Sequence, residues 1–168
     1  MLVCVISVYV CHIGQNNVQD NYNTSNQQLS TTDQQRDLGI IITKDLKWQK
    51  QTEKSCKTVN RVLGLIARNL WYKNKELIIP LYKSLVRPHL EHAVQIWSPN
   101  LRRDIDKLEK ALRRATMMIP KIVKHCYHQR IQHLDYISLV QRRLRGQLIE
   151  VFKYMNGFTT ASARGLFD

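Results

Sequence analysis

The stretch LYKSLVRPHLEHAVQIWSPN, residues 81–100, determines how the rest of the chain must be arranged. Pro88 lacks a backbone N–H and disfavours αR geometry at Arg87, so we expect a kink or break there and a second short helical run over 89–96. Large apolar residues at helical spacing predict an amphipathic helix before the break: Leu77, Ile78, Leu81, Tyr82, Leu85 and Val86. A helix this apolar needs flanking helices to cover it.

The flanking segments carry further helical patterns with recognisable end signals. The predicted helices span about 49–69, 101–119 and 128–134, with a last helix from 138 to 157. Asn74 and Asn100 are candidate N-caps, because their side chains can accept from unpaired backbone N–H groups. Ser138 and Gln141 match a capping box, and Gly157 provides a stop signal for the last helix.

Two of these helices carry long apolar stripes. The helix over 101–119 has a predicted buried seam of Leu101, Ile105, Leu108, Leu112, Ala115 and Ile119. The apolar stripe of the last helix comprises Val140, Leu144, Leu148, Val151, Phe152 and Met155. Basic residues occupy much of the remaining surface of both helices.

The residues before 49 have a different character. MLVCVISVYVCHIG (1–14) is apolar and β-branched, which predicts a buried strand that ends near Gly14. A signal peptide is the alternative, although the segment has neither a positive n-region nor a clear cleavage site. Residues 15–35 hold eleven Asn and Gln and predict a loop, with a weak strand around Leu29 as an alternative, and 38–43 form a second predicted strand. The fold class is therefore mainly α (α+β), with a short N-terminal β-hairpin followed by a basic bundle of about four to five helices.

Charge is concentrated in the later part of the chain. The net charge is +13, and all 26 Lys and Arg follow residue 35; with the 11 acidic residues found there, that part carries +15. Such a concentration of positive charge predicts a polyanion partner, nucleic acid above all, with a solvated basic surface as the alternative. Four cysteines without a CxxC motif indicate reduced thiols inside a cell.

Several stretches, in order, resemble reverse transcriptases of non-LTR (LINE-type, jockey-like) retrotransposons. LYKSLVRPHLEHAVQIWSP (81–99), followed by LRRDIDKLEKALRRATMMIP (101–120), is similar to the region after the palm in those enzymes. Further matches are RDLGIIITKDLKW (36–48), NRVLGLIAR (60–68), SLVQRRLRGQLIEVFKYMNG (138–157) and, weakly, HIG (12–14). The resemblance covers most of residues 36–157, and it implies the end of the palm and the helical thumb of an RNA-directed DNA polymerase.

The resemblance also suggests how the chain is divided. Palm-edge strands would occupy 1–48, a helical thumb-like domain 49–157, and a flexible tail 158–168. The strand at 38–43 would pair with the first strand as a hairpin at the edge of the palm. A nuclear, intracellular location would follow from the family alone.

A thumb holds duplex by its backbone, so the implied partners are an RNA template and the DNA/RNA hybrid duplex. No small-molecule substrate or membrane is expected, and the oligomeric state stays open. The leading candidates for nucleic-acid contact are Arg102, Arg103, Lys107, Lys110, Arg113 and Arg114, followed by Arg142, Arg143 and Arg145. Each could instead be a solvated surface residue. Trp71 and Tyr72 could stack on a base or sugar, but we favour core packing for both.

The sequence lacks the paired aspartates that catalyse polymerisation in reverse transcriptases. Reverse transcriptases use an aromatic-x-Asp-Asp turn to hold two metal ions, and the chain has no Asp-Asp pair. Asp104 and Asp106 are two apart on a predicted helix and so face different ways. In the family the catalytic aspartates precede the HIG strand, so no catalytic residue can be carried over. We infer that the chain lacks polymerase activity by itself, with no cofactor of its own, because Mg²⁺ would belong to the missing palm.

One possible metal motif is also present. Cys126, His128 and His133, with His125 beside them, raise the possibility of zinc, but the spacing fits no standard structural set and packing or surface roles are favoured. Three hypotheses about function remain: a truncated, catalytically inactive reverse transcriptase, a stand-alone basic helical module that binds RNA or DNA, and a relic without function.

Overall fold

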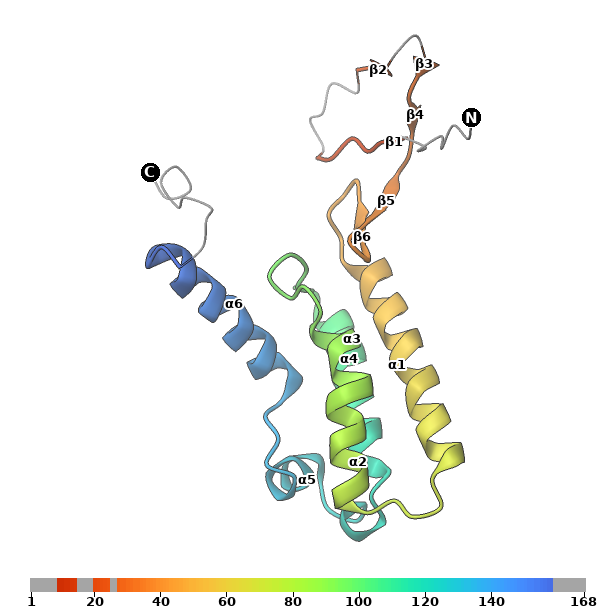
Figure 1. Ribbon diagram of the computed structural model, residues 1–168, viewed down its shortest axis with the longest axis vertical. Coiled ribbons are helices and arrows are strands. Elements are labelled where there is room, and N and C mark those ends of the chain that lie inside the picture. Colours follow the sequence, from red (N-terminus) through yellow and green to blue (C-terminus); the bar gives the residue numbers. More distant parts are fainter. Residues whose placement is uncertain (1–8, 15–19, 25–26, 159–168) are drawn as a thin grey trace, which may run out of the picture. The chain divides into compact units, whose positions relative to one another are not determined.

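The computed structural model of the chain describes residues 9–14, 20–24 and 27–158 (Figure 1). The protein is mainly α with short strands near its N-terminus, which confirms the predicted fold class. Two compact units, 1–51 and 52–168, can be distinguished, and each is described by itself. Most of the predicted first strand and most of the predicted tail lie outside the described residues.

Short strand pairs make up the described part of the first unit. β1 (Tyr9–Val10) pairs in parallel with β4 (Ser30–Thr31), β2 (Asn23–Thr24) pairs antiparallel with β3 (Gln27–Gln28), and β5 (Gln34–Asp37) pairs antiparallel with β6 (Ile40–Thr43). The Asn- and Gln-rich segment, predicted to be a loop with a weak strand around Leu29 as an alternative, therefore contains several of these short strands, with β3 and β4 on either side of Leu29.

The β5–β6 hairpin corrects two predictions about residues 38–43. Leu38 and Gly39 have φ angles of 44° and 87°, so they form the two-residue turn and not the start of the strand. Positive φ at both central positions defines a type I′ turn, whose twist suits a hairpin. β6 pairs with β5 and not, among the described residues, with the first strand. β5 is adjacent to β6 in the sequence, so their pairing closes a loop of only two residues. Closing this loop costs less conformational entropy than pairing β6 with the more distant first strand.

Helices form the second unit. The helical segments are α1 (Gln49–Asn69), α2 (Lys75–Leu81), η1 (Tyr82–Val86), α3 (Arg87–Glu91), α4 (Arg102–Met117), η2 (Pro120–Ile122), α5 (Tyr127–His133) and α6 (Leu139–Met155). α1 has the bounds that the periodicity predicts. α4, α5 and α6 lie within two residues of their predicted starts.

The predicted end signals act at most helix ends. Asn74 Oδ1 accepts from the N–H of Leu77 at 3.2 Å, and Ser138 Oγ accepts from the N–H of Gln141 at 3.3 Å. Gly157, at φ 69°, follows α6 as predicted. The prediction for Asn100 is wrong, because Leu101 is the N-cap residue of α4 and makes no side-chain capping bond.

The helix does not break at Pro88. Arg87 stays in the αR region, and its N–H donates to the carbonyl of Tyr82 in a π-helical turn. A π turn widens the backbone, which gives the proline ring room where an α turn would place a carbonyl against it. The second helical run is shorter than predicted. α3 ends at Glu91, and Ala93 has a φ of 50°.

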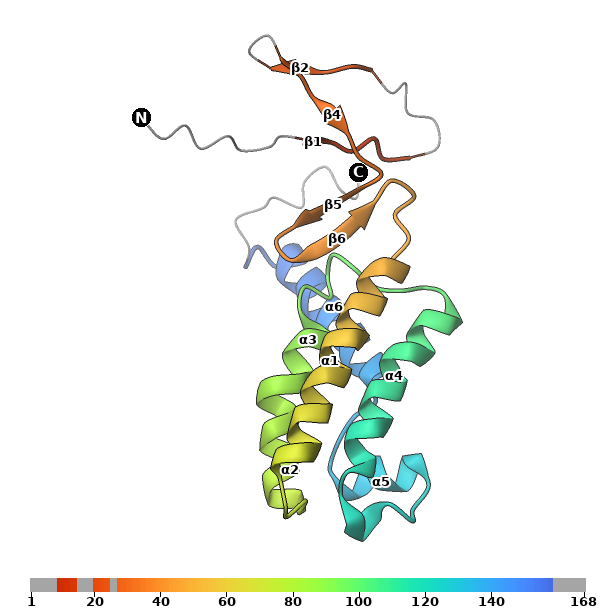
Figure 2. The same ribbon diagram turned by 90° about the vertical axis from the view of Figure 1, so that its right-hand side faces the viewer.

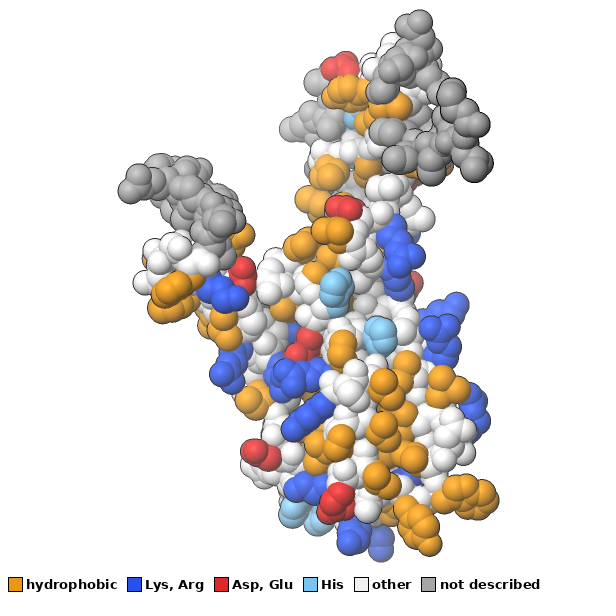
Figure 3. All heavy atoms as spheres, viewed as in Figure 1, with side chains coloured by type: hydrophobic (Ala, Val, Ile, Leu, Met, Phe, Trp, Pro, Cys, Tyr) orange, Lys and Arg blue, Asp and Glu red, His pale blue; other side chains and the backbone are white. Residues whose placement is uncertain are grey.

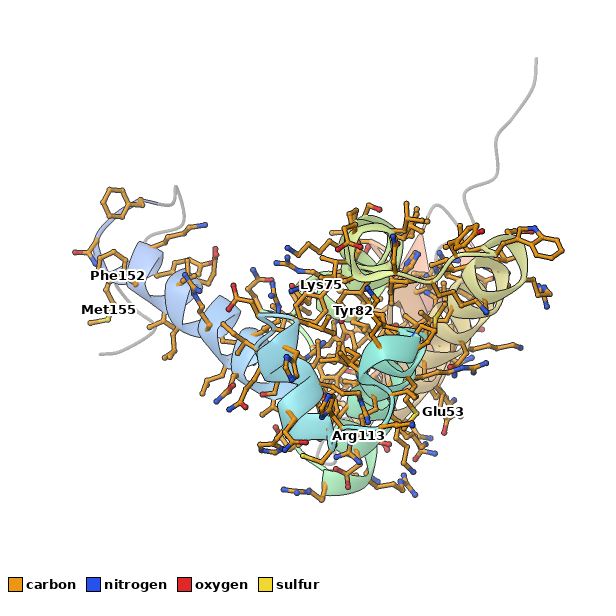
Figure 4. The ribbon with its side chains drawn as sticks, turned by 90° about the horizontal axis from the view of Figure 1, so that it is seen from below. Glu53, Lys75, Tyr82, Arg113, Phe152 and Met155 are labelled. Carbon is orange, nitrogen blue, oxygen red and sulfur yellow. The ribbon has the colours of Figure 1, made fainter. Side chains whose placement is uncertain are left out.

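The core of the helical unit lies between α1, the α2–η1–α3 rod and α4. Its largest fully buried side chain is Trp97. The rod contributes Ile78, Tyr82, Val86 and Leu90, while the buried side of α4 includes Leu108 and Leu112. Tyr82 lies among the helices in Figure 4. The wide stripe of the rod is covered only in part, since Leu77 and Leu85 remain exposed.

Candidate nucleic-acid interface

α4 separates its apolar and basic residues onto opposite sides. Ala111, Leu112 and Ala115 are buried, together with most of the predicted seam, although Leu101 is exposed. The opposite arc of the helix carries all six predicted cations: Arg102, Arg103, Lys107, Lys110, Arg113 and Arg114. Lys107 is half-buried and the other five are exposed. One side of a single helix therefore presents a dense row of positive charge.

α1 lies beside α4 and adds to this row. Lys107 Nζ is 3.0 Å from Glu53 Oε1, and Arg114 Nη1 donates to Asn60 Oδ1 at 3.0 Å. The same sequence offset of 54 residues at both contacts means that the helices run parallel and in register (Figure 2). Cations also occupy the exposed side of α1 next to these contacts: Lys57, Arg61 and Arg68.

We call this surface the α1–α4 basic face, comprising the six α4 cations with Lys57, Arg61 and Arg68. In the view of Figure 3, Lys and Arg side chains lie along the edge formed by α1. The parallel register brings the two rows of charge together, with Glu53 at the contact between the helices.

Ion pairs neutralise only part of the basic face. Glu53 pairs with Lys107 and raises the pKa of that ammonium through their hydrogen bond. Asp106 lies 3.6 Å from Arg102, an exposed pair of the kind that contributes little to stability. Among the described residues, Lys110 and Arg113 have no acidic partner. The buried Asp104 lies 3.6 Å from both Arg103 and Lys107. Lys110 and Arg113 can therefore meet phosphates without first losing an ion pair, whereas Arg103 and Lys107 share theirs with an internal carboxylate.

Arg143 does not belong to this exposed surface. Its side chain is buried, its guanidinium lies 4.1 Å above the ring of Trp97, and it donates to the carbonyls of Leu90 and Trp97. Burial lowers its pKa to about 10, so the group stays protonated at neutral pH. The sequence could not reveal this, because an arginine between two others on a helix looks like surface charge.

The other two predicted contacts on α6 differ from each other. Arg142 is half-buried and pairs with Glu91, its Nε lying 2.6 Å from Oε1. Glu91 also pairs with Arg87, so one carboxylate binds two guanidinium groups. Arg145 is exposed on α6. The three arginines therefore do not form one cluster: one is buried, one is paired and one faces solvent.

A buried polar network lies behind α4 that sequence analysis did not predict. The Tyr127 hydroxyl donates to Glu109, and Arg113 lies 4.8 Å over the Tyr127 ring. Burial and then the Glu109 hydrogen bond raise the pKa of Tyr127. Arg130 donates to Thr116 at 3.1 Å. The network joins α5 to α4 and holds Arg113 at the rim of the basic face.

The residues considered for metal binding are placed as follows. Asp104 is buried and Asp106 is half-exposed, on different sides of α4. The rings of His125 and His133 are 4.9 Å apart, and Cys126 is the N-cap residue of α5. In the described part of the chain, no group of three or more His, Cys, Asp or Glu is arranged to hold a metal ion.

Trp71 and Tyr72 contradict the prediction of core packing. Both lie in the loop between α1 and α2, where Trp71 is 95% and Tyr72 is 82% exposed. A loop of five residues between two helices, 70–74, is too short to fold both rings back onto the core. Their exposure leaves two aromatic rings at one end of the basic face.

Comparisons with known proteins identify no relative: no protein-family model, curated protein or solved structure matches the chain. Among the described residues, none of the helices combines the length and apolar character needed to cross a bilayer.

Proposed function

We propose that the helical unit binds nucleic-acid duplex through the α1–α4 basic face. The observation that carries the proposal is the alignment of two parallel helices whose exposed cations share one surface. Among the described residues, these cations pair with three acidic residues, the exposed Glu53, the half-exposed Asp106 and the buried Asp104. Contacts to phosphate depend on charge and position and need no base-specific geometry. The arginines and lysines of this face supply the charge, and the two helices fix its position.

The ordered sequence motifs favour a particular setting for this binding. They resemble the thumb of a non-LTR reverse transcriptase, in which α1, the α2–η1–α3 rod and α4 would form the bundle that holds an RNA template and its DNA strand. We therefore propose the A-form RNA/DNA hybrid as the preferred duplex. The chain would hold this duplex without catalysing polymerisation, because no residue of it matches the catalytic aspartates.

The structure refines the set of proposed contacts. The six α4 cations remain, Lys57, Arg61 and Arg68 join them, and Arg145 stays as an outlying candidate. Arg143 is withdrawn, because a guanidinium bonded to two buried carbonyls cannot reach a phosphate without unfolding its surroundings. Arg142 would first have to leave Glu91.

The salt dependence of hybrid binding tests the proposal. In fluorescence anisotropy with a labelled RNA/DNA hybrid, the double variant Arg103→Ala/Lys110→Ala should bind more weakly. It should also flatten the plot of log K against log salt by roughly 0.9 for each lost phosphate contact. The variant Lys83→Ala/Lys153→Ala removes the same charge from α6 and the rod, so its slope should stay near wild type.

Extending the first variant to Arg102→Ala/Arg103→Ala/Lys107→Ala/Lys110→Ala should flatten the slope further. Equal slopes for the α4 variants and the control would show that general positive charge, and not this face, attracts the duplex. A wild-type chain that folds but binds no nucleic acid would overturn the proposal and favour a relic without function.

A further inference from the structure

The loop between α1 and α2 exposes two aromatic side chains, Trp71 and Tyr72, and backbone hydrogen bonds fix both ends of the loop. Leu70 N–H donates to Ile66 at 3.2 Å at the end of α1, and Ile78 N–H donates to Asn74 at 3.0 Å at the start of α2. Between these anchors Trp71 and Tyr72 are almost fully exposed. The two rings are exposed to water, and the hydrogen bonds at its ends restrain the loop that carries them. They are therefore available to a partner with flat apolar surfaces.

Basic residues flank the aromatic pair in the sequence. Arg68 and Lys75 are exposed on either side of the loop, Lys73 is half-buried within it, and Glu76 is the only acidic residue among 68–76. The ammonium of Lys75 donates to the carbonyl of His133 at 2.9 Å, so it is directed toward α5 (Figure 4). Arg68 and Lys73, one on each side of the rings in the sequence, favour a partner that is anionic as well as flat.

The aromatic pair also continues the α1–α4 basic face. Lys57, Arg61 and Arg68 lie along one exposed side of α1, and 11 residues separate the first from the last, about 16 Å of helix at 1.5 Å per residue. Gly64 lies between them on the same side, and no described atom outside its own helix backbone lies within 4 Å of where its Cβ would be. A strand whose phosphates follow this row arrives at Trp71 and Tyr72.

We propose that Trp71 and Tyr72 stack on unpaired bases of a single-stranded stretch that continues from the bound duplex. The inference rests on the proposed duplex binding and adds a substrate class to it: a duplex with a single-stranded extension. Every base has a flat face, so stacking on aromatic rings beside a basic groove holds single strands without sequence preference. A paired base inside a duplex offers no such face, which makes the extension the part that this loop recognises.

The test compares a blunt RNA/DNA hybrid with the same hybrid carrying a short single-stranded extension. Wild type should bind the extended hybrid about tenfold more tightly, since stacking contributes roughly 1–3 kcal/mol per base. Trp71→Ala/Tyr72→Ala should abolish that gain and leave blunt binding unchanged. Trp71→Phe/Tyr72→Phe keeps both rings and should retain most of the gain. Both positions are exposed, so all variants should fold.

Tryptophan fluorescence provides a second, local readout. Stacking should quench the emission of exposed Trp71 on addition of the extended hybrid, and Trp71→Phe should remove that quenching. Trp97 is buried and Trp48 is half-buried, so the measurement is made in a Trp48→Phe background, which leaves Trp71 as the one exposed tryptophan. If wild type binds blunt and extended hybrids equally, the inference is wrong while the proposed function stands. If wild type binds single strands through Trp71 but no duplex, the proposed function fails and stacking survives. A blue shift with anionic vesicles, without quenching by nucleic acid, would overturn the stacking in favour of a membrane surface.

Discussion

α4 and α6 have similar lengths, 16 and 17 residues, and both carry long apolar stripes. The stripe of α4 is mostly buried, whereas the stripe of α6 is mostly exposed. In α4 the stripe is the core: Leu112 is only 1% exposed. In α6 Leu148 and Phe152 are each 60% exposed. Figure 4 shows Phe152 and Met155 pointing away from the other helices.

The side of α6 that does face the bundle is unusual in composition. It contains Leu139, Arg143 and Gly146, and a Cβ on Gly146 would come within 3.1 Å of Val94. A glycine allows close approach, and a buried arginine replaces the apolar side chain expected there. The comparison shows that an apolar stripe marks what a helix can bury, whereas the neighbours available decide what it does bury.

The largest expected effect is on stability, and it distinguishes the buried stripe of α4 from the exposed stripe of α6. Leu112→Ala should lower the free energy of unfolding by about 3 kcal/mol, because it removes buried methyl groups and leaves a cavity. Leu148→Ala should change it by less than about 0.5 kcal/mol, because its side chain is already in water. Urea denaturation followed by circular dichroism measures both. Similar losses in the two variants would show that α6 is as well packed as α4.

The next test concerns the attachment of α6. Arg143→Met should lower the free energy of unfolding by about 2 kcal/mol, because the buried carbonyls of Leu90 and Trp97 lose their donor. Hydrogen exchange of the α6 amides should accelerate more than that of the α4 amides. The matched control is Arg145→Met, which removes an exposed guanidinium and should leave both measurements near wild type. No difference between these variants would mean that Arg143 does not anchor the helix.

A smaller effect should appear at high pH. Burial raises the pKa of Tyr136 to about 12 and also raises that of Tyr82. The folded state therefore keeps these phenol protons at pH values where the unfolded state has lost them. Their contribution to stability is full below pH 10 and falls as pH rises through 12. Unfolding midpoints measured from pH 9 to 12 follow the loss, and their decline with pH should be shallower in Tyr136→Phe. An unchanged slope would contradict the burial of that phenol.

The smallest effect on stability is expected for polar replacement of the α6 stripe. Leu148→Gln/Phe152→Gln should shift the free energy of unfolding by no more than about 1 kcal/mol. It should nevertheless lower the binding of a dye that fluoresces on apolar surfaces, since it removes two exposed side chains. Severe destabilisation would show that another part of the protein covers this stripe.

Much of the helical unit could be predicted because its signals are local. The bounds of α1 follow from periodicity, and the start and stop of α6 follow from Ser138 and Gly157. Capping bonds join residues three or four apart, so the sequence contains both partners.

Features that depend on distant neighbours were not predictable. Arg143 is buried by carbonyls 46 and 53 residues away, which no periodicity records. The exposure of Trp71 follows from the geometry of a short loop. The α1–α4 basic face was only half foreseen: its cations on α4 were identified, but the parallel register that adds Lys57, Arg61 and Arg68 required the structure.

Lysine acetylation footprinting with the RNA/DNA hybrid tests the proposed interface most directly, because α4 and α6 each carry an exposed lysine. The protein is labelled with and without hybrid, and modification at each lysine is measured by mass spectrometry. Binding through the α1–α4 basic face predicts that Lys57 and Lys110 become protected while Lys153 reacts as before. Protection of Lys153 with Lys57 and Lys110 unchanged would place the duplex on α6 and contradict the interface proposed for α1 and α4.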